Sequence, residues 1–212
     1  MSAQASRRRA VFVDKDGTLI ENIPYNVDVA RMQFAPGAER AVPRLAAAGF
    51  AIVVVSNQAG VARGMFDEAA VAAVGRALTD RLAALGVGLG GFYYCPHDPR
   101  GAVARHRRMC GCRKPAPGLI VRAARELGVD LSASWLVGDI LDDIEAGRRA
   151  GCRTILIDAG NETEWRMSRA RLPHHVAADL DEAARLIVAL DAAAETAGAT
   201  RPYAAAAQAS GP

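Results

Sequence analysis

No stretch of the chain is apolar over the length that a transmembrane helix needs, which is about 20 residues. The first residues also lack the apolar centre of a signal peptide. Both absences argue against a membrane partner and favour a cytoplasmic location. The chain has 212 residues, of which 51% are hydrophobic, and this is enough for one α/β domain with a sizeable core.

Neither sign of charge dominates the composition. The sequence has 26 basic and 23 acidic residues, and its net charge of +3 is too balanced to require a nucleic-acid partner. A small anionic substrate fits this charge equally well. The chain contains no internal repeat and no linker. We therefore predict a mobile basic tail over residues 1–9, one domain over residues 10–190, and an Ala-rich tail over residues 191–212, in which we expect a frayed helix that passes into disorder.

The first strong pattern is an apolar run that breaks into acidic residues. Residues 11–13 are Val-Phe-Val, which is typical of a buried strand, and Asp14-Lys15-Asp16-Gly17-Thr18 follows at once. Ligands of open α/β sheets bind past the carboxyl ends of strands. Gly17 permits a tight turn that folds Asp14 and Asp16 toward one point, where an oxygen-only pair suits Mg²⁺. An ordinary surface turn is the alternative interpretation.

The same order of strand and polar residue occurs twice more. Residues 51–55 precede Ser56, whose hydroxyl could meet a phosphate oxygen, although Ser-Asn also commonly starts a turn. Residues 135–138 precede Asp139, which suits a third carboxylate for Mg²⁺, and Asp143 could orient the metal's water ligands or Lys114. Helical patterns alternate with these strands. We therefore predict a Rossmann-like α/β fold, a parallel sheet with helices on both faces.

Three of the four cysteines crowd into one segment together with a histidine. Cys95-Pro-His97 and Cys110-Gly-Cys112 supply three thiolates and one imidazole, which suits a closed tetrahedral Zn²⁺ site. Because no ligand position stays open, this zinc would be structural and would stabilise a long loop that has no core of its own. The alternative is a set of scattered buried cysteines. Cys152 lies outside the cluster and is expected to be a small core residue.

Residues 95–114, here called the zinc loop, end in Arg113-Lys114 before a proline. Lys114 lies between a zinc ligand and that proline, so its ammonium could be held as a point charge for a phosphate. Arg113 could form a forked contact with another substrate oxygen. The basic run over residues 105–108 is more often a solvated loop.

Four motifs in this order resemble those of the haloacid dehalogenase-like superfamily. They are Asp14 with Asp16, then Ser56, then Lys114, and finally Asp139 with Asp143. The chain looks like the histidinol-phosphatase subfamily. Within it, the run Ser-Asn-Gln-x-Gly-x-Ala-Arg-Gly, the zinc loop and the run Cys-Arg-Lys-Pro-x-Pro-Gly are similar to phosphatases of heptose bisphosphates. The likeness covers about residues 10–190, with no evident cap-domain insertion.

The resemblance implies a role for each motif. Asp14 would be the nucleophile that becomes an aspartyl-phosphate, and Asp16 the general acid and base. Ser56 and Lys114 would stabilise the transferring phosphoryl group, and Mg²⁺ would be held by Asp14, the backbone carbonyl of Asp16, and Asp139. The implied substrate contacts are Asn22, Ile23, Pro24, Tyr25, Asn57, Gln58, Ala59 and Arg113.

The implied function is a Mg²⁺-dependent phosphatase, expected to be monomeric, that removes the 7-phosphate of a heptose 1,7-bisphosphate during heptose biosynthesis for cell-surface glycans. Histidinol phosphate is the alternative substrate. A non-catalytic zinc-stabilised phosphate-binding module is disfavoured because a binder would not need Asp16, and a polynucleotide phosphatase would want a broad basic groove. Two residues depart from the heptose enzymes, since Lys15 stands where Arg is usual and Ile140 where Lys is frequent.

Overall fold

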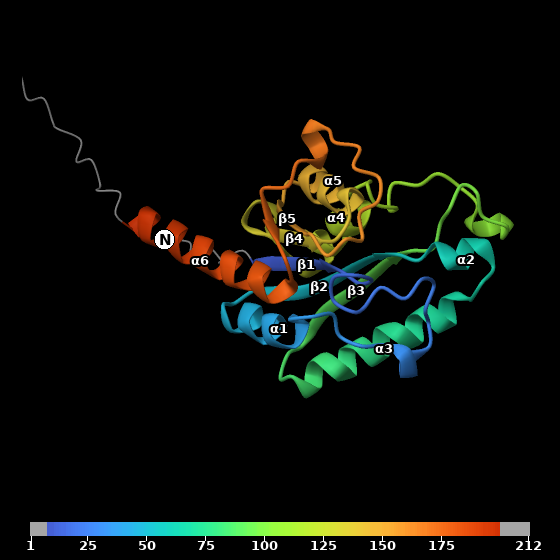
Figure 1. Ribbon diagram of the computed structural model, residues 1–212, viewed down its shortest axis with the longest axis horizontal. Coiled ribbons are helices and arrows are strands. Elements are labelled where there is room, and N and C mark those ends of the chain that lie inside the picture. The colour runs from blue at the N-terminus through green and yellow to red at the C-terminus, as the bar shows by residue number, and fades with distance from the viewer. Residues whose placement is uncertain (1–7, 200–212) are drawn as a thin grey trace, which may run out of the picture.

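Six parallel strands form one sheet at the centre of the molecule in the computed structural model, which describes residues 8–199 (Figure 1). The strand order is β3-β2-β1-β4-β5-β6. From β1 the chain first adds strands on one side and then crosses to add β4 on the other, so the order reverses between β1 and β4. The strands are β1 Ala10–Asp14, β2 Ala51–Asn57, β3 Leu89–Cys95, β4 Trp135–Gly138, β5 Arg153–Ile157 and β6 His175–Ala177.

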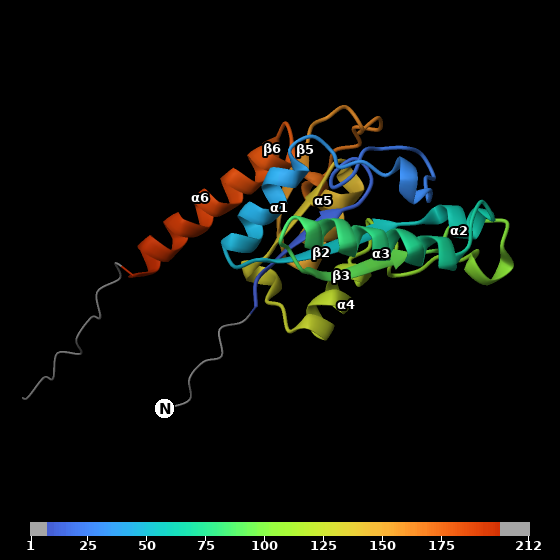
Figure 2. The ribbon, with the colours of Figure 1, turned by 90° about the horizontal axis from the view of Figure 1, so that it is seen from below.

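Helices cover both faces of the sheet, which confirms the predicted fold class. Figure 1 shows α4 and α5 on one side of the strands and α1 and α3 on the other, and α6 runs beside α1 (Figure 2). The α-helices are α1 Ala38–Ala47, α2 Ala59–Arg63, α3 Glu68–Ala84, α4 Gly118–Leu127, α5 Leu141–Ala150 and α6 Leu180–Ala199. The 3₁₀ helices are η1 Val29–Arg31, η2 Ala104–His106, η3 Leu131–Ala133 and η4 Arg169–Arg171.

Strand β1 shows why the central strands have to be apolar throughout. Its side chains alternate between the two faces, so Val11 and Val13 pack with α1, α3 and α6, whereas Ala10 and Phe12 pack with α4. All four are fully buried. A strand covered on both faces has no solvated side, and its sequence therefore reads as a continuous apolar run. Residues 8–199 include no inserted cap domain.

The two expected tails differ in part from the structure. Arg8 bridges to Val129, and Arg9 pairs with Asp191 at 2.5 Å, so both residues are attached to the domain. Helix α6 continues to Ala199, so residues 191–199 are helical, in keeping with the high helix propensity of an Ala-rich run. The rest of the two predicted tails, residues 1–7 and 200–212, lies outside the described residues. Within residues 8–199, no helix combines the length and apolar character needed to cross a membrane.

Leu78 of α3 tests the packing of this core. It is fully buried among apolar residues of α3 and the sheet, so Leu78→Ala should leave a cavity and lower the free energy of unfolding by about 2–5 kcal/mol. Leu172→Ala makes the same change at a side chain that is 56% exposed, and should alter the free energy of unfolding by less than about 0.5 kcal/mol. Denaturant unfolding of both variants measures the difference, and equal losses would contradict this packing.

Candidate active site

Three buried carboxylates meet where the strand order reverses, which is the usual ligand site of an open α/β sheet. Asp14 is the last residue of β1, Asp139 follows β4, and Asp143 lies in the first turn of α5. One oxygen atom from each lies within 4.8 Å of the other two. The structure therefore brings together Asp14 of the first sequence motif and both acids of the last one.

Lys114 brings a positive charge into this acidic cluster. Its buried ammonium contacts Asp14 Oδ1, lies 2.6 Å from Asp143 Oδ1, and donates to the Val55 carbonyl at 3.1 Å. Asn57 at the end of β2 holds the Lys114 backbone with two hydrogen bonds of 3.0 Å. Burial by itself would lower the pKa of Lys114, but Asp14 and then Asp143 outweigh it and hold the pKa above its usual range.

One ammonium does not balance three carboxylates. Burial, and then the charge of Asp14, raises the pKa of Asp139 to about 8. Burial also raises the pKa of Asp143 to about 7, against the opposing effect of Lys114. Buried carboxylate oxygens that repel one another are the donor set that a hard divalent cation prefers, so these residues fit Mg²⁺.

Gly17 allows the turn after β1 to approach Asp139. Its φ is +87°, and a Cβ atom there would lie 2.1 Å from Asp139 Oδ2. Thr18, the next residue, donates its hydroxyl to Asp139 Oδ1 at 3.2 Å. Asn161, from the loop after β5, lies against the same turn and accepts a hydrogen bond from Asn22 at 3.4 Å. The sequence carried no signal for Asn161, because a polar residue in an irregular loop is commonplace.

Asp16 is held on both of its carboxylate oxygens. The buried ammonium of Lys15 lies 2.8 Å from Oδ1, and the Gln58 amide donates to Oδ2 at 3.2 Å. The same amide donates to Ser56 Oγ at 2.8 Å, so Asp16 and Ser56 are linked through one side chain. Burial raises the pKa of Asp16, while Lys15 opposes this rise.

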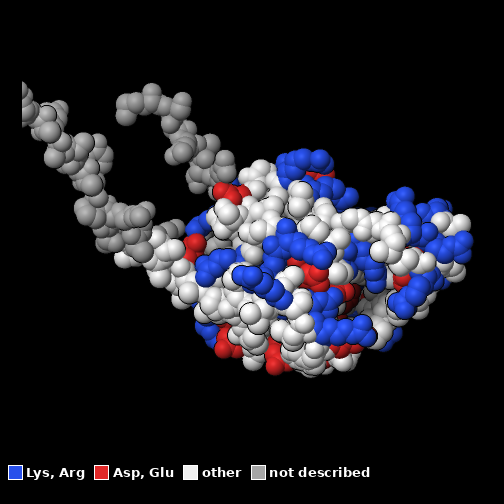
Figure 3. Space-filling view, turned by 90° about the horizontal axis from the view of Figure 1, so that it is seen from above, with Lys and Arg blue, Asp and Glu red and all other residues white. Residues whose placement is uncertain are grey.

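A cleft of about 220 Å³ opens beside Asp16. Seen from above, acidic side chains lie inside a hollow with basic side chains around it (Figure 3). Seven of the eight predicted substrate contacts line the cleft, and Pro24 does not. The seven are Asn22, Ile23, Tyr25, Asn57, Gln58, Ala59 and Arg113. The sequence did not predict four further lining residues, which are Asn26, Gly60, Arg63 and Phe66.

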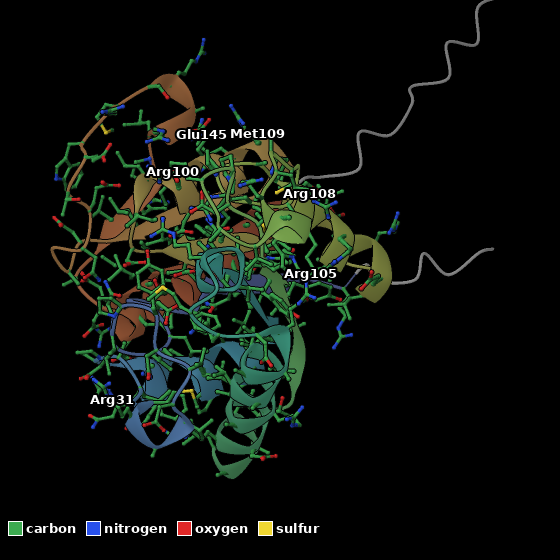
Figure 4. The ribbon with its side chains drawn as sticks, turned by 90° about the vertical axis from the view of Figure 1, so that its right-hand side faces the viewer. Arg31, Arg100, Arg105, Arg108, Met109 and Glu145 are labelled. Carbon is green, nitrogen blue, oxygen red and sulfur yellow. The ribbon has the colours of Figure 1, made fainter. Side chains whose placement is uncertain are left out.

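The two halves of the cysteine cluster come together at the end of β3. The three Sγ atoms lie 3.2–3.6 Å apart, and His97 Nδ1 lies 3.5 Å from Cys95 Sγ and 3.3 Å from Cys112 Sγ. A tetrahedral zinc centre spaces its ligands by about 3.3–3.8 Å, given bonds of about 2.0–2.3 Å. All four cysteines are free thiols, and the donor set fits Zn²⁺. Figure 4 looks onto this edge and labels Arg100, Arg105 and Arg108 of the zinc loop.

The known proteins that this chain resembles are HAD-like hydrolases and heptose bisphosphate phosphatases. A family model described as HAD-hydrolase-like matches residues 111–183. The D-glycero-beta-D-manno-heptose-1,7-bisphosphate 7-phosphatase of Yersinia pestis is 41% identical over 152 residues, covering 71% of this chain and 81% of the relative. The protein of the same name from Escherichia coli strain K12 is 38% identical over 177 residues, covering 79% and 93%. The solved D,D-heptose 1,7-bisphosphate phosphatase from B. bronchiseptica, complexed with magnesium and phosphate, is 30% identical with a TM-score of 0.70, covering 86% of this chain and 99% of that chain.

The parallel sheet and its buried acidic cluster define an open α/β fold that carries its site at the switch point between β1 and β4. The chain belongs to the HAD-like hydrolases, the family that includes these phosphatases, and it is an enzyme of that class.

We expect Mg²⁺ to raise the melting temperature more at pH 8 than at pH 6. The pKa of Asp139 is about 8 in the metal-free fold, so at pH 6 its proton competes with the cation. A carboxyl group whose pKa is raised in the folded state stabilises the fold at low pH, where it is protonated. This stabilisation is progressively lost as the pH rises through 8, because the carboxyl group then loses its proton. A cation can take the place of that proton. Thermal unfolding in Mg²⁺ and in EDTA measures the effect, and Asp139→Asn should reduce it. A larger shift at pH 6 would contradict this expectation.

Protein made without added metal should contain close to one zinc per chain. The donor spacing predicts that Cys112→Ser lowers this zinc content strongly, because it removes one of four ligands. Cys152→Ser is the matched control and should keep the zinc, since Cys152 is buried beside apolar residues of the core. Elemental analysis of reduced protein provides the measurement. Undamaged protein without zinc would rule out the site.

Proposed function

We propose that this enzyme removes the 7-phosphate from a heptose 1,7-bisphosphate and belongs to the histidinol-phosphatase subfamily. The observation that carries the proposal is the buried cluster of Asp14, Asp139, Asp143 and Lys114, which adjoins a cleft lined by most of the expected substrate contacts. The names of the relatives supply the substrate. The cleft is small and polar, in keeping with a small phosphate ester.

In the proposed reaction an Asp14 oxygen attacks the phosphorus atom in line and forms an aspartyl-phosphate. The bond from phosphorus to the sugar oxygen breaks, and that oxygen leaves with the electron pair and takes a proton from Asp16. Asp16 then takes a proton from water, whose oxygen attacks the phosphorus. This second step releases inorganic phosphate and restores the Asp14 carboxylate. Gln58 and Lys15, which hold the two oxygens of Asp16, would orient it for both transfers.

Charge on the transferring group needs stabilisation. Lys114 contacts Asp14, and Ser56 is linked through Gln58 to Asp16, so both side chains lie beside the reacting atoms of the proposed reaction. Asp143 would keep Lys114 in position. When bound, Mg²⁺ would supply further charge stabilisation as a Lewis acid, held by Asp14, the backbone carbonyl of Asp16, and Asp139.

We assign a structural role to the zinc. Cys95, His97, Cys110 and Cys112 would hold the zinc loop so that Arg113 and Lys114 face the site. Arg113 lines the cleft and donates to the His97 carbonyl at 3.2 Å, so its direction depends on a zinc ligand. We also propose that the enzyme acts as a monomer in the cytoplasm.

Initial rates on three substrates test the proposal. Heptose 1,7-bisphosphate, histidinol phosphate and a 3′-phosphorylated oligonucleotide are compared in Mg²⁺ and in EDTA. We expect Mg²⁺-dependent hydrolysis with the highest kcat/KM for the heptose. A preference for histidinol phosphate would support the proposed phosphatase chemistry but would show that the heptose is not the substrate. If none of the three substrates is hydrolysed in a Mg²⁺-dependent way, the proposed function is refuted.

Asp14→Asn and Asp16→Asn should each lower turnover to near background. Loss of the nucleophile removes the covalent step, and loss of the general acid and base alone costs about 10²–10⁴-fold. Both variants should fold, because each replaces a carboxylate with a neutral side chain of the same shape. Asp142→Asn is the control, since Asp142 pairs with Arg171 at 2.6 Å and does not line the cleft. If Asp14→Asn keeps more than about a tenth of the wild-type turnover, the aspartyl-phosphate mechanism is wrong.

Arg113→Ala should lower kcat/KM for heptose 1,7-bisphosphate by about 10–100-fold, the value of one charge-assisted contact of about 1.5–3 kcal/mol. The loss on p-nitrophenyl phosphate should be much smaller, because that substrate offers no second anionic group. Steady-state kinetics on both substrates give the comparison. Equal losses would show that Arg113 serves the chemical step or the fold instead of substrate recognition.

A further inference from the structure

Arg63 is the second arginine that lines the cleft, and its side chain is held from two sides. It extends from the end of α2 and donates from Nε and NH2 to Asp98 Oδ2 at 3.0 and 2.9 Å. On the other side NH1 donates to the Tyr25 hydroxyl, and the guanidinium lies 5.3 Å from the centre of the Tyr25 ring. A surface arginine left free in solvent would not be held in this way.

Asp98 connects Arg63 to the zinc loop. Its carboxylate is 1% exposed, and the Arg100 backbone donates to its second oxygen at 3.0 Å, so its position is well defined. Asp98 directly follows His97, whose carbonyl accepts the hydrogen bond from Arg113. Two consecutive residues of the zinc loop therefore orient both arginines of the cleft.

Arg63 has N–H groups that are not bound to Asp98 and that a ligand could use. A guanidinium has five N–H groups in a fixed fork, and two of those of Arg63 are used on Asp98. The end formed by NH1 and NH2 remains, and there Tyr25 takes one bond. Tyr25 is 43% exposed, so this bond lies at the surface, where a ligand can reach it.

The charges on this side of the cleft favour an anion. Arg63, Arg113 and Asp98 together carry one net positive charge, and the Asp98 carboxylate is on the buried side. The two nearby lysines are already matched, since Lys114 faces Asp14 and Asp143 and Lys15 faces Asp16. A forked end of Arg63 beside Arg113 has the geometry that recognises a phosphate.

We propose that Arg63 and Arg113 form a second anion subsite, in which Arg63 recognises the phosphate at the far end of a bisphosphorylated substrate and Asp98 is its positioning residue. This assignment rests on the proposed phosphatase function. Tyr25 occupies the fork of Arg63 until the substrate's distal phosphate replaces it. The subsite makes the enzyme prefer a bisphosphate to the corresponding monophosphate.

The test compares heptose 1,7-bisphosphate with heptose 7-phosphate, which share the reacting phosphate and differ only in the distal one. Arg63→Ala should lower the ratio of the two kcat/KM values by at least about tenfold, mainly through a higher KM for the bisphosphate. Arg63→Lys keeps the charge without the fork and should recover part of the ratio. Asp98→Asn should also lower the ratio while zinc content stays near one per chain. In the double variant Arg63→Ala/Arg113→Ala the preference should vanish.

Arg107→Ala is the matched control, because Arg107 is an exposed arginine of the zinc loop that does not line the cleft. It should leave both kcat/KM values unchanged. Equal losses on the two substrates in Arg63→Ala and Arg63→Lys, or an unchanged ratio in both, would overturn the assignment of Arg63. Neither outcome would contradict the phosphatase function. That function is tested separately, by Mg²⁺-dependent hydrolysis of either heptose phosphate by the wild-type enzyme. If the wild-type enzyme hydrolyses neither heptose phosphate, the function and the subsite fail together.

Discussion

The buried ammonium of Lys114 holds together the parts of the chain on which the site depends. It contacts Asp14 at the end of β1 and lies 2.6 Å from Asp143 in α5, while its backbone is bound by Asn57 of β2. Removing one partner from a buried ion pair leaves an uncompensated charge and costs about 3–5 kcal/mol. This cluster therefore requires the end of the zinc loop to stay against the carboxyl edge of the sheet.

The zinc loop is one of the segments that enclose the cleft. Residues 8–199 contain no cap, so the cleft is walled by the loop after β1, by α2 and by the zinc loop. In a loop without an apolar core, little burial of apolar surface stabilises one conformation. Metal ligation can supply the free energy that orders such a loop. The His97 carbonyl and the Asp98 carboxylate accept hydrogen bonds from Arg113 and Arg63, respectively, so an ordered zinc loop also orients these two side chains. Substrate selectivity in this proposal is thus a consequence of zinc binding.

Much of the fold and the cluster could be predicted because the signals are local. A buried strand needs an apolar run, and the polar residue that ends it, as at Asp14 or Asp139, is visible in the sequence. Arg63 could not be found in this way, because its importance depends on Asp98, which lies 35 residues further along the chain. From residue 191 the sequence also led us to expect a frayed helix, and residues 191–199 are helical, in keeping with the high helix propensity of alanine.

By itself the sequence determined the parallel α/β sheet, the pairing of Cys95-x-His97 with Cys110-x-Cys112, and the order of the four motifs. These depend on residue type and spacing over a few residues, which the chain carries locally. Only the tertiary structure decided that Asp14, Asp139 and Asp143 lie within 4.8 Å of one another, and that Arg63 shares a cleft with Arg113. The reason is that parallel strands bring residues far apart in the chain to one edge, and the loops that meet there are positioned by contacts with one another.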